Sequence, residues 1–187
     1  AKDLFDNKNF HSYKATNEYF FDTLMNLVLK YFKINVNETS LIDLGSGKGK
    51  VLLMSLKFNF HKIIGIEYSE QLYEDSLNNI LTFSKNQKKY KTTNIEVFNI
   101  DASLFNYDNK KPTIYFIYNS FSKEIRMQVL QKIKNQYNIN KTLAVVIFYM
   151  PLGELILDDL SGFEEMKQVD KCCMLNYQVY YFSEKVY

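Results

Sequence analysis

Two patterns of apolar residues alternate along this chain. Short apolar runs are followed by longer stretches in which apolar residues return every third or fourth position. Short runs indicate buried strands, and the longer spacing indicates helices that bury one face. Their alternation predicts a mostly parallel sheet with helices on both faces. The strands are expected at about residues 41–44, 62–66, 95–100, 113–118 and 142–149, and the helices at about 17–32, 48–58 and 70–85, with one more after Ser122.

Polar residues that favour helix N-termini stand before three of these helices. Thr16, Ser69 and Ser122 each have a side-chain oxygen that can accept a hydrogen bond from the first helical turn. The first helix should pack on the sheet through apolar residues that recur at three and four positions. These residues are Phe20, Phe21, Leu24, Leu27, Val28 and Tyr31.

The C-terminal part has a different pattern. The apolar run at 142–149 has the composition of a strand that is buried on both sides. Two strand-like segments follow, at about 165–174 and 178–183, on either side of the turn-prone Asn176. They predict an antiparallel hairpin at the end of the chain.

The segment from Leu41 to Lys50 carries the strongest signal for chemistry. It reads as an apolar strand that runs into a turn with Gly45, Gly47 and Gly49, after which a helix begins. Glycines without side chains allow backbone amides to approach a ligand. The following strand ends at Glu67, whose carboxylate could accept hydrogen bonds from both hydroxyls of a ribose. This arrangement predicts a site for a ligand that carries a ribose.

The spacing of the glycines narrows the choice of ligand. The dinucleotide-binding pattern has a third glycine three positions after the second, where this chain has Lys50. The phosphate-binding loop requires four residues between its glycines and a hydroxyl after its lysine, whereas this chain has Val51 after Lys50. Asp43 lies just before the turn, where a carboxylate suits a cationic ligand better than a pyrophosphate.

Asp43 and the following glycine turn, together with Glu67, resemble the first two motifs of the class I S-adenosylmethionine-dependent methyltransferases. The resemblance implies an α/β fold of the Rossmann-like type, with a doubly wound, mostly parallel seven-stranded sheet and a C-terminal antiparallel hairpin. It also implies S-adenosyl-L-methionine as cofactor and S-adenosyl-L-homocysteine as product. In the family, the acid that matches Asp43 helps to hold the cationic methionine end. The turn residues that the resemblance places beside the cofactor are Gly45, Ser46, Gly47 and Gly49.

Length and continuity predict one domain. A chain of 187 residues without an internal repeat or linker fits a single methyltransferase domain, residues 1–187. Residues 1–35 are expected to form an N-terminal segment and helix that could fold as a flap over the site. Residues 36–150 would form the cofactor-binding core, and residues 151–187 the C-terminal hairpin.

The resemblance extends to the adenine end of the cofactor. Asp101 ends the third predicted strand, and the family often has an acid there that accepts the adenine amino group. The backbone amide of the next residue, Ala102, would then meet a ring nitrogen. Strand-end aspartates are also common in turns, which is the alternative interpretation. Tyr68 and Ile66 could pack on the adenine faces, although such residues beside a core strand are usually part of the core.

The expected position of the reacting group follows the fourth predicted strand. Asn119 resembles the first residue of the Asn/Asp-Pro-Pro-Tyr/Phe motif of amino-group methyltransferases, and Phe121 could form a wall of the pocket. Ser120 and the missing prolines depart from that motif, so Asn119 and Ser120 could also be a simple turn before Ser122. His11 could serve as a general base, but a lone histidine in a polar terminal segment usually does not.

Composition and charge exclude several other classes. The hydrophobic content of 47% argues against disorder, and no apolar run approaches the ~20 residues needed to cross a bilayer. A net charge of +2 is too small to indicate nucleic-acid binding. Cys172 and Cys173 are adjacent, which suits neither a structural disulfide nor a metal site. We therefore expect a cytoplasmic protein without a metal. The chain begins at Ala1 with no basic-then-apolar leader, and residues could be missing before it.

Taken together, the sequence predicts a methyltransferase that moves a methyl group by in-line displacement to a nitrogen or oxygen nucleophile. The acceptor is unidentified and could be a protein side chain or a small molecule, and the oligomeric state is open. Three alternatives remain: a non-catalytic module that binds S-adenosylmethionine, an NAD-dependent oxidoreductase, and a structural or interaction domain.

Overall fold

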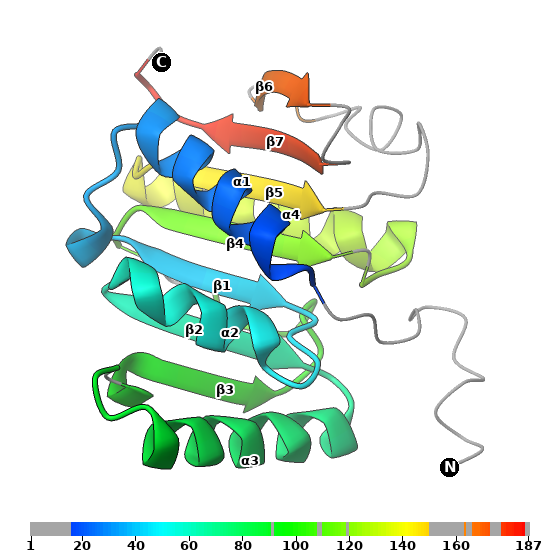
Figure 1. The fold of residues 1–187 in the computed structure, drawn as a ribbon. Helices are drawn as coiled ribbons and strands as arrows, with labels where there is room; N and C mark the ends of the chain where they lie inside the picture. Colours follow the sequence, from blue (N-terminus) through cyan, green and yellow to red (C-terminus); the bar gives the residue numbers. More distant parts are fainter. Residues whose placement is uncertain are drawn as a thin grey trace.

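Seven strands form one sheet in the part of the chain that the structure describes (Figure 1). The computed structural model describes residues 16–90, 92–107, 110–118, 120–149, 163, 166–172 and 177–185. The strand order is β3-β2-β1-β4-β5-β7-β6. The strands are β1 (Ser40–Leu44), β2 (Lys62–Glu67), β3 (Ile95–Asn99), β4 (Thr113–Tyr118), β5 (Ala144–Tyr149), β6 (Lys167–Cys172) and β7 (Tyr177–Phe182).

The first five strands are parallel, and β7 is antiparallel to both β5 and β6. This confirms the predicted doubly wound, mostly parallel sheet with a C-terminal antiparallel hairpin. The order reverses at β1, which lies between β2 and β4, so the carboxyl ends of β1 and β4 are neighbours. In open sheets of this kind, ligands bind beyond the strand ends at such a reversal.

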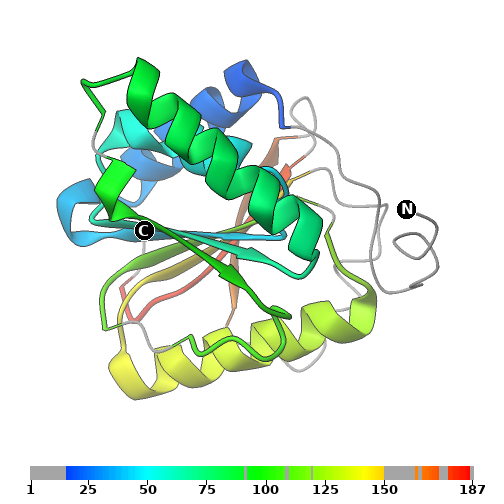
Figure 2. The ribbon, with the colours of Figure 1, turned by 90° about the horizontal axis from the view of Figure 1, so that it is seen from below.

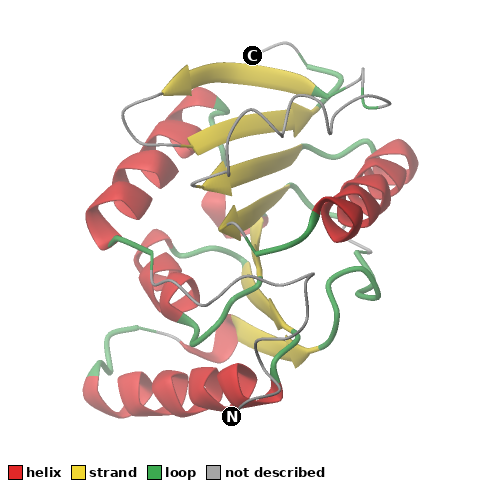
Figure 3. Ribbon diagram, turned by 90° about the vertical axis from the view of Figure 1, so that its right-hand side faces the viewer, coloured by secondary structure: helices red, strands yellow, loops and turns green. Residues whose placement is uncertain are grey.

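Helices cover both faces of the sheet, as predicted. One face carries α1 (Glu18–Tyr31), α2 (Lys50–Ser55) and α3 (Glu70–Asn86), and the opposite face carries α4 (Lys123–Asn140) (Figures 2 and 3). Short 3₁₀ segments lie at Val36–Glu38, Leu56–Phe58 and Thr92–Asn94. None of the helices in the described ranges is long and apolar enough to span a bilayer.

Two of the three predicted N-caps are confirmed. The Ser69 hydroxyl accepts a hydrogen bond from the Leu72 amide, and the Ser122 hydroxyl accepts one from the Ile125 amide. The prediction for the first helix is wrong by one residue. Asn17, not Thr16, is the cap, because its side-chain oxygen accepts a hydrogen bond from Phe20 N at 3.3 Å. Asparagine is at least as good an N-cap as threonine.

The predicted buried face of α1 is also partly wrong. The helix buries Phe21, Leu24, Met25 and Val28, whereas the side chains of Leu27 and Tyr31 are on the exposed surface. Residues 21, 24, 25 and 28 follow a spacing of three and four, so both faces satisfied the periodicity rule. The structure selects the face that includes Met25, which the sequence analysis omitted.

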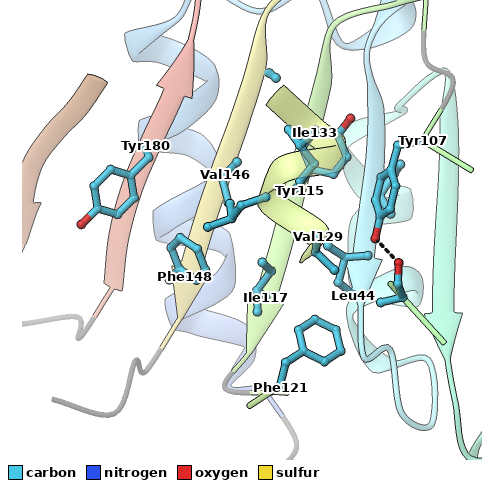
Figure 4. Close-up of a cluster of buried hydrophobic side chains, with 14 of the residues drawn as sticks. Leu44, Tyr107, Tyr115, Ile117, Phe121, Val129, Ile133, Val146, Phe148 and Tyr180 are labelled. Carbon is cyan, nitrogen blue, oxygen red and sulfur yellow. Dashed lines mark hydrogen bonds between the residues drawn. The ribbon is translucent and has the colours of Figure 1, made fainter. Parts of the chain in front are cut away.

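A hydrophobic core lies on each side of the sheet. The core under α4 contains Val129 and Ile133 together with inward side chains of β4 and β5 (Figure 4). It also holds Tyr107, whose hydroxyl donates a hydrogen bond to the Ala102 carbonyl at 2.9 Å (Figure 4). Burial raises the pKa of the Tyr107 hydroxyl, so it stays a donor. This hydrogen bond joins the two ends of segment 102–107, which follows β3, and holds the segment against the core.

Candidate functional site

The glycine turn between β1 and α2 has a backbone that only glycine adopts easily. Gly45, Gly47 and Gly49 have φ angles of +80°, +52° and +78°, in the left-handed region. The amides of Gly45 and Ser46 both donate to the carbonyl of Ile66, each at 2.9 Å. The turn is therefore fastened to the end of β2. The left-handed Gly49 also explains why the helix begins at Lys50 and not at the predicted residue 48.

Packing within the protein leaves little room for a side chain at two of the three glycines. A Cβ atom on Gly45 would lie 2.4 Å from the Ser120 hydroxyl oxygen and 2.5 Å from its Cβ. A Cβ atom on Gly49 would lie 3.2 Å from the Cβ of Ser76 in α3. From the sequence, these glycines were expected to allow the approach of a ligand. The structure adds a second reason for them, because the turn is pressed between the loop after β4 and helix α3.

Glu67 joins the glycine turn to the start of α3. Its carboxylate is 8% exposed; Oε2 accepts a hydrogen bond from Gly47 N and Oε1 accepts one from Ser69 N, both at 2.8 Å. Burial raises the pKa of the Glu67 carboxyl, and the amides of Ser69, Gly47 and Tyr68 partly offset this increase. Each carboxylate oxygen has further acceptor capacity. Glu67 can therefore hold the turn and still accept hydroxyl groups of a ligand.

Asp43 lies close to Glu67 but has a different environment. It is 3% exposed in β1, in register with Gly65 of β2 and Phe116 of β4. Burial raises the pKa of the Asp43 carboxyl well above its usual range, and the charge of Glu67 raises it further. No residue in the described ranges donates a hydrogen bond to it. Buried carboxyls usually accept hydrogen bonds, so the surroundings of Asp43 differ from those of Glu67.

Ser46 is a second buried polar group without a partner among the described residues. Its hydroxyl oxygen is shielded from solvent and makes no hydrogen bond there. The Ser46 hydroxyl packs against Gly65. A Cβ atom added to Gly65 would lie 2.8 Å from the Ser46 hydroxyl oxygen and 2.7 Å from Leu52 Cδ1. Gly65 thus makes room for the turn. Gly65 was not predicted to have a role, although a glycine inside a buried strand is a signal of close backbone approach.

The turn is also tied to α3 on its outer side. Lys48 Nζ forms an ion pair with Asp75 at 3.0 Å, and the Asn79 side-chain amide donates to the Lys48 carbonyl at 3.0 Å. These contacts involve exposed or half-exposed groups, so they orient the turn more than they stabilise it. They keep the Lys48 ammonium on the outer side.

The predicted adenine-binding residues lie at the end of β3, next to Glu67. The Asn99 side-chain amide donates to the carbonyls of Glu67 and Tyr68, both at 3.0 Å. Asp101 accepts a hydrogen bond from Ser103 N at 2.7 Å through Oδ1, as the turn interpretation expected. Ala102 is buried beside it. The structure therefore brings Asp101 and Ala102 to the edge that holds Glu67, and their role toward adenine stays a prediction.

Tyr68 and Ile66 differ sharply in exposure. The Tyr68 side chain is 54% exposed beside Glu67, so its ring is accessible to a ligand. Ile66 is fully covered within the core under α4. Of the two residues considered for the adenine faces, Tyr68 is the exposed one.

The acceptor side of the site is the loop after β4. Asn119 lies outside the described residues, as do His11 and the whole of segment 1–15. Ser120 donates a hydrogen bond to the Tyr118 carbonyl at 2.9 Å and contacts Gly45, so this loop touches the glycine turn. Phe121 is buried in the core beside Ile117 (Figure 4). Its burial favours a packing role, and a pocket-wall role stays a prediction.

Two tyrosines that the sequence analysis did not single out stand at the same edge. Tyr118 ends β4 and Tyr149 ends β5, in register, with ring centroids 5.0 Å apart in an edge-to-face contact. Burial raises the pKa of both hydroxyls. Within the described ranges, His, Cys, Asp and Glu do not gather into a group that could hold a metal ion.

Known proteins resemble this chain in structure and not in sequence. No protein-family sequence model and no curated protein sequence matches it. A protein from Methanococcus maripaludis assigned as an S-adenosyl-L-methionine-dependent methyltransferase aligns with a TM-score of 0.65 and 12% identity, covering 95% of this chain and 98% of that one. A SAM-dependent methyltransferase from Aquifex aeolicus aligns with a TM-score of 0.59 and 14% identity, covering 89% and 98%.

A third structure was solved with S-adenosylmethionine bound. Magnesium protoporphyrin IX methyltransferase from Synechocystis aligns with a TM-score of 0.58 and 10% identity, covering 91% of this chain and 85% of that one. At such low identities the likeness establishes the fold. The chain therefore has the seven-stranded fold of the class I S-adenosylmethionine-dependent methyltransferases, the family that its glycine turn and its two acids resemble.

Proposed function

We propose that this protein is a methyltransferase that uses S-adenosyl-L-methionine. The observation that carries the proposal is the meeting of Asp43, the glycine turn and Glu67 at the reversal of the sheet, with Gly47 hydrogen-bonded to Glu67. The acids come from adjacent strands and face the same side. Such an edge is where open α/β sheets bind ligands, and the fold is that of the family that the motifs resemble.

The residues at this edge fit the chemical groups of the cofactor. The Ser46 hydroxyl is buried without a partner among the described residues, and the buried Asp43 carboxyl lies close by in β1. The cofactor has an ammonium, a carboxylate and a sulfonium that could interact with them. Glu67 would bind the ribose hydroxyls. Asp101 and the Ala102 amide would bind adenine, and Tyr68 would cover one adenine face.

When bound, the cofactor supplies a methyl group on a positively charged sulfur, and S-adenosyl-L-homocysteine is the product. The residues of this chain would align the acceptor nucleophile with the methyl–sulfur bond and exclude water. Alignment alone can lower the activation barrier by ~7–11 kcal/mol. Asn119 would orient the acceptor, and Phe121 would support the pocket. The acceptor nucleophile is a nitrogen or oxygen of a protein side chain or small molecule.

The NAD-dependent alternative is weaker for three reasons. Lys50 takes the place of the third glycine of the dinucleotide pattern. Asp43 lies next to the turn, where an acid suits a cationic ligand better than a pyrophosphate. An antiparallel β7 inserted between β5 and β6 also differs from the dinucleotide-binding strand order. A non-catalytic module that binds S-adenosylmethionine remains the second candidate, and only a turnover assay separates it from the enzyme.

The rest of the proposal concerns organisation and location. A single domain is supported by one continuous sheet with a core on each face. A cytoplasmic location is supported by the low cysteine content, two residues in 187.

Calorimetric titration tests the cofactor part of the proposal. We expect S-adenosylmethionine and S-adenosylhomocysteine to bind and NAD not to bind. Glu67→Gln should weaken binding of both adenosyl ligands at least tenfold, since the neutral amide loses charge-assisted bonds to the ribose. Glu74→Gln is the matched control, because Glu74 is an exposed residue on α3, and it should bind like wild type. Full binding by Glu67→Gln would show that the pocket has been misplaced.

Turnover is tested by transfer of a labelled methyl group into fractionated cell extract. Protein, nucleic-acid, glycan and small-molecule pools are scored separately, with Glu67→Gln as the negative control. Label in one pool identifies the acceptor class. Cofactor binding without label in any pool would favour the non-catalytic module.

A further inference from the structure

Asp43 and Glu67 form a pair of buried carboxyls on adjacent strands. Asp43 is in register with Gly65, and Glu67 stands two residues further along the same strand and on the same face. In a sheet of ordinary spacing their Cα atoms are about 8 Å apart. Two charges this close in a poorly solvated place repel each other, so the pair resists carrying two negative charges.

The protein holds the two carboxyls unequally. Glu67 accepts one backbone hydrogen bond on each oxygen, from Gly47 and from Ser69. Asp43 receives none from a described residue. Hydrogen bonds donated to a carboxylate favour its ionised form. The structure therefore favours the negative charge on Glu67 and the proton on Asp43.

The charged groups around the pair do not neutralise it. In the glycine turn, Lys48 is paired with Asp75 of α3 and is half exposed. At the start of α2, Lys50 is exposed. On α1, Glu18 and Asp22 both bind Lys57.

The neighbouring strand ends add no cation. Asp101 follows β3 with one oxygen held by Ser103 N, and Tyr118 ends β4 with a partly buried hydroxyl. Of the ion pairs formed by described residues, none includes Asp43 or Glu67. The described residues therefore supply no positive charge to balance a doubly ionised pair, and a cationic ligand would supply it.

We propose that the ligand-free protein carries a proton on Asp43, and that a cationic nucleoside displaces this proton when it binds. This inference rests on the proposed function, and it adds that cofactor binding and proton release are coupled. The bond that breaks is the Asp43 O–H bond, and the proton leaves to solvent. The positive groups of the ligand then balance the negative charge of the Asp43 carboxylate.

The coupling depends on the charge of the ligand. S-adenosylmethionine brings a sulfonium and an ammonium, S-adenosylhomocysteine brings only the ammonium, and methylthioadenosine brings neither. Affinity for S-adenosylmethionine should rise with pH, by up to about tenfold per pH unit while Asp43 is protonated, and level off above its titration. Affinity for methylthioadenosine should change little over the same range. S-adenosylhomocysteine should lie between them.

Calorimetry in buffers of different ionisation enthalpy counts the protons released on binding. We expect up to one proton for S-adenosylmethionine and close to none for methylthioadenosine with the wild-type protein. Asp43→Asn should bind S-adenosylmethionine without releasing a proton. Binding without proton release by wild type, or equal release by Asp43→Asn, would overturn the inference and leave the proposed function standing. Failure of every adenosyl ligand to bind would overturn the proposed function instead.

A second measurement does not depend on any ligand. The carboxyl carbon signals of aspartates can be followed by NMR as the pH of the ligand-free protein is raised. The Asp43 signal, identified by its absence in Asp43→Asn, should keep its protonated position after exposed aspartates have ionised. Titration of Asp43 together with exposed aspartates would refute the proton assignment.

Discussion

Replacing Gly45 with alanine tests how the glycine turn is packed. A Cβ atom at this position meets the Ser120 hydroxyl oxygen at 2.4 Å and the Ser120 Cβ at 2.5 Å. The new residue also has to adopt a φ of +80°. The left-handed backbone costs roughly 1–2 kcal/mol for a residue with a Cβ, and overpacking costs typically 1–3 kcal/mol. We expect Gly45→Ala to lower the free energy of unfolding by about 2–5 kcal/mol.

A double-mutant cycle separates the two contributions. Ser120→Gly removes both atoms that the new Cβ would meet, so Gly45→Ala should cost only the backbone part, about 1–2 kcal/mol, in that background. Ser120→Ala is the matched control, since it keeps the Cβ atom at 2.5 Å and should restore little. Urea denaturation of wild type, the three single variants and the two double variants gives the free energies of unfolding. An equal cost of Gly45→Ala in wild type and in Ser120→Gly would refute the assignment of the clash.

Three further predictions concern the surroundings of the site. Gly65→Ala should lower the free energy of unfolding by about 1–3 kcal/mol, because its Cβ would meet Leu52 and Ser46 within 2.8 Å; urea denaturation measures this, and an unchanged midpoint would contradict the packing described. Tyr107→Phe should cost about 1–3 kcal/mol by the same measurement, since the Ala102 carbonyl is left without its donor; no loss would mean that this bond does not stabilise the segment. Asp43→Asn should become more stable than wild type as pH rises. The folded protein binds the Asp43 proton more tightly than the unfolded chain, so wild-type stability falls from about pH 3.8 up to the raised pKa. Denaturation at acidic and neutral pH checks the sign, and a gain confined to acidic pH would contradict it.

Features that depend on neighbouring residues in the sequence were predicted well. The caps Ser69 and Ser122 were found because the donor amide is three residues away. The bounds of β4, Thr113–Tyr118, were predicted to the residue because an apolar run stands between polar segments. The mostly parallel seven-stranded sheet and its antiparallel ending followed from the family resemblance and the terminal pattern.

Features that depend on distant segments were missed or only partly explained. Leu27 and Tyr31 fit the helical spacing as well as Met25 does, and only the position of the sheet decides which face is buried. A side chain at position 65 would clash with Ser46, and a side chain at position 45 would clash with Ser120. Both are contacts between segments that are distant in the sequence. The sequence therefore predicted which candidate residues gather at the strand ends, but it could not show how closely they are packed.

The hydrogen bonds of Glu67 have a consequence for affinity. One side chain fixes both the turn at Gly47 and the beginning of α3 at Ser69. The conformational entropy of these two segments is therefore lost when the protein folds, and it does not have to be lost again when a ligand binds. If the proposed site is right, a ligand would bind to segments that are already ordered, and more of its contact energy would be available for discriminating between related nucleosides.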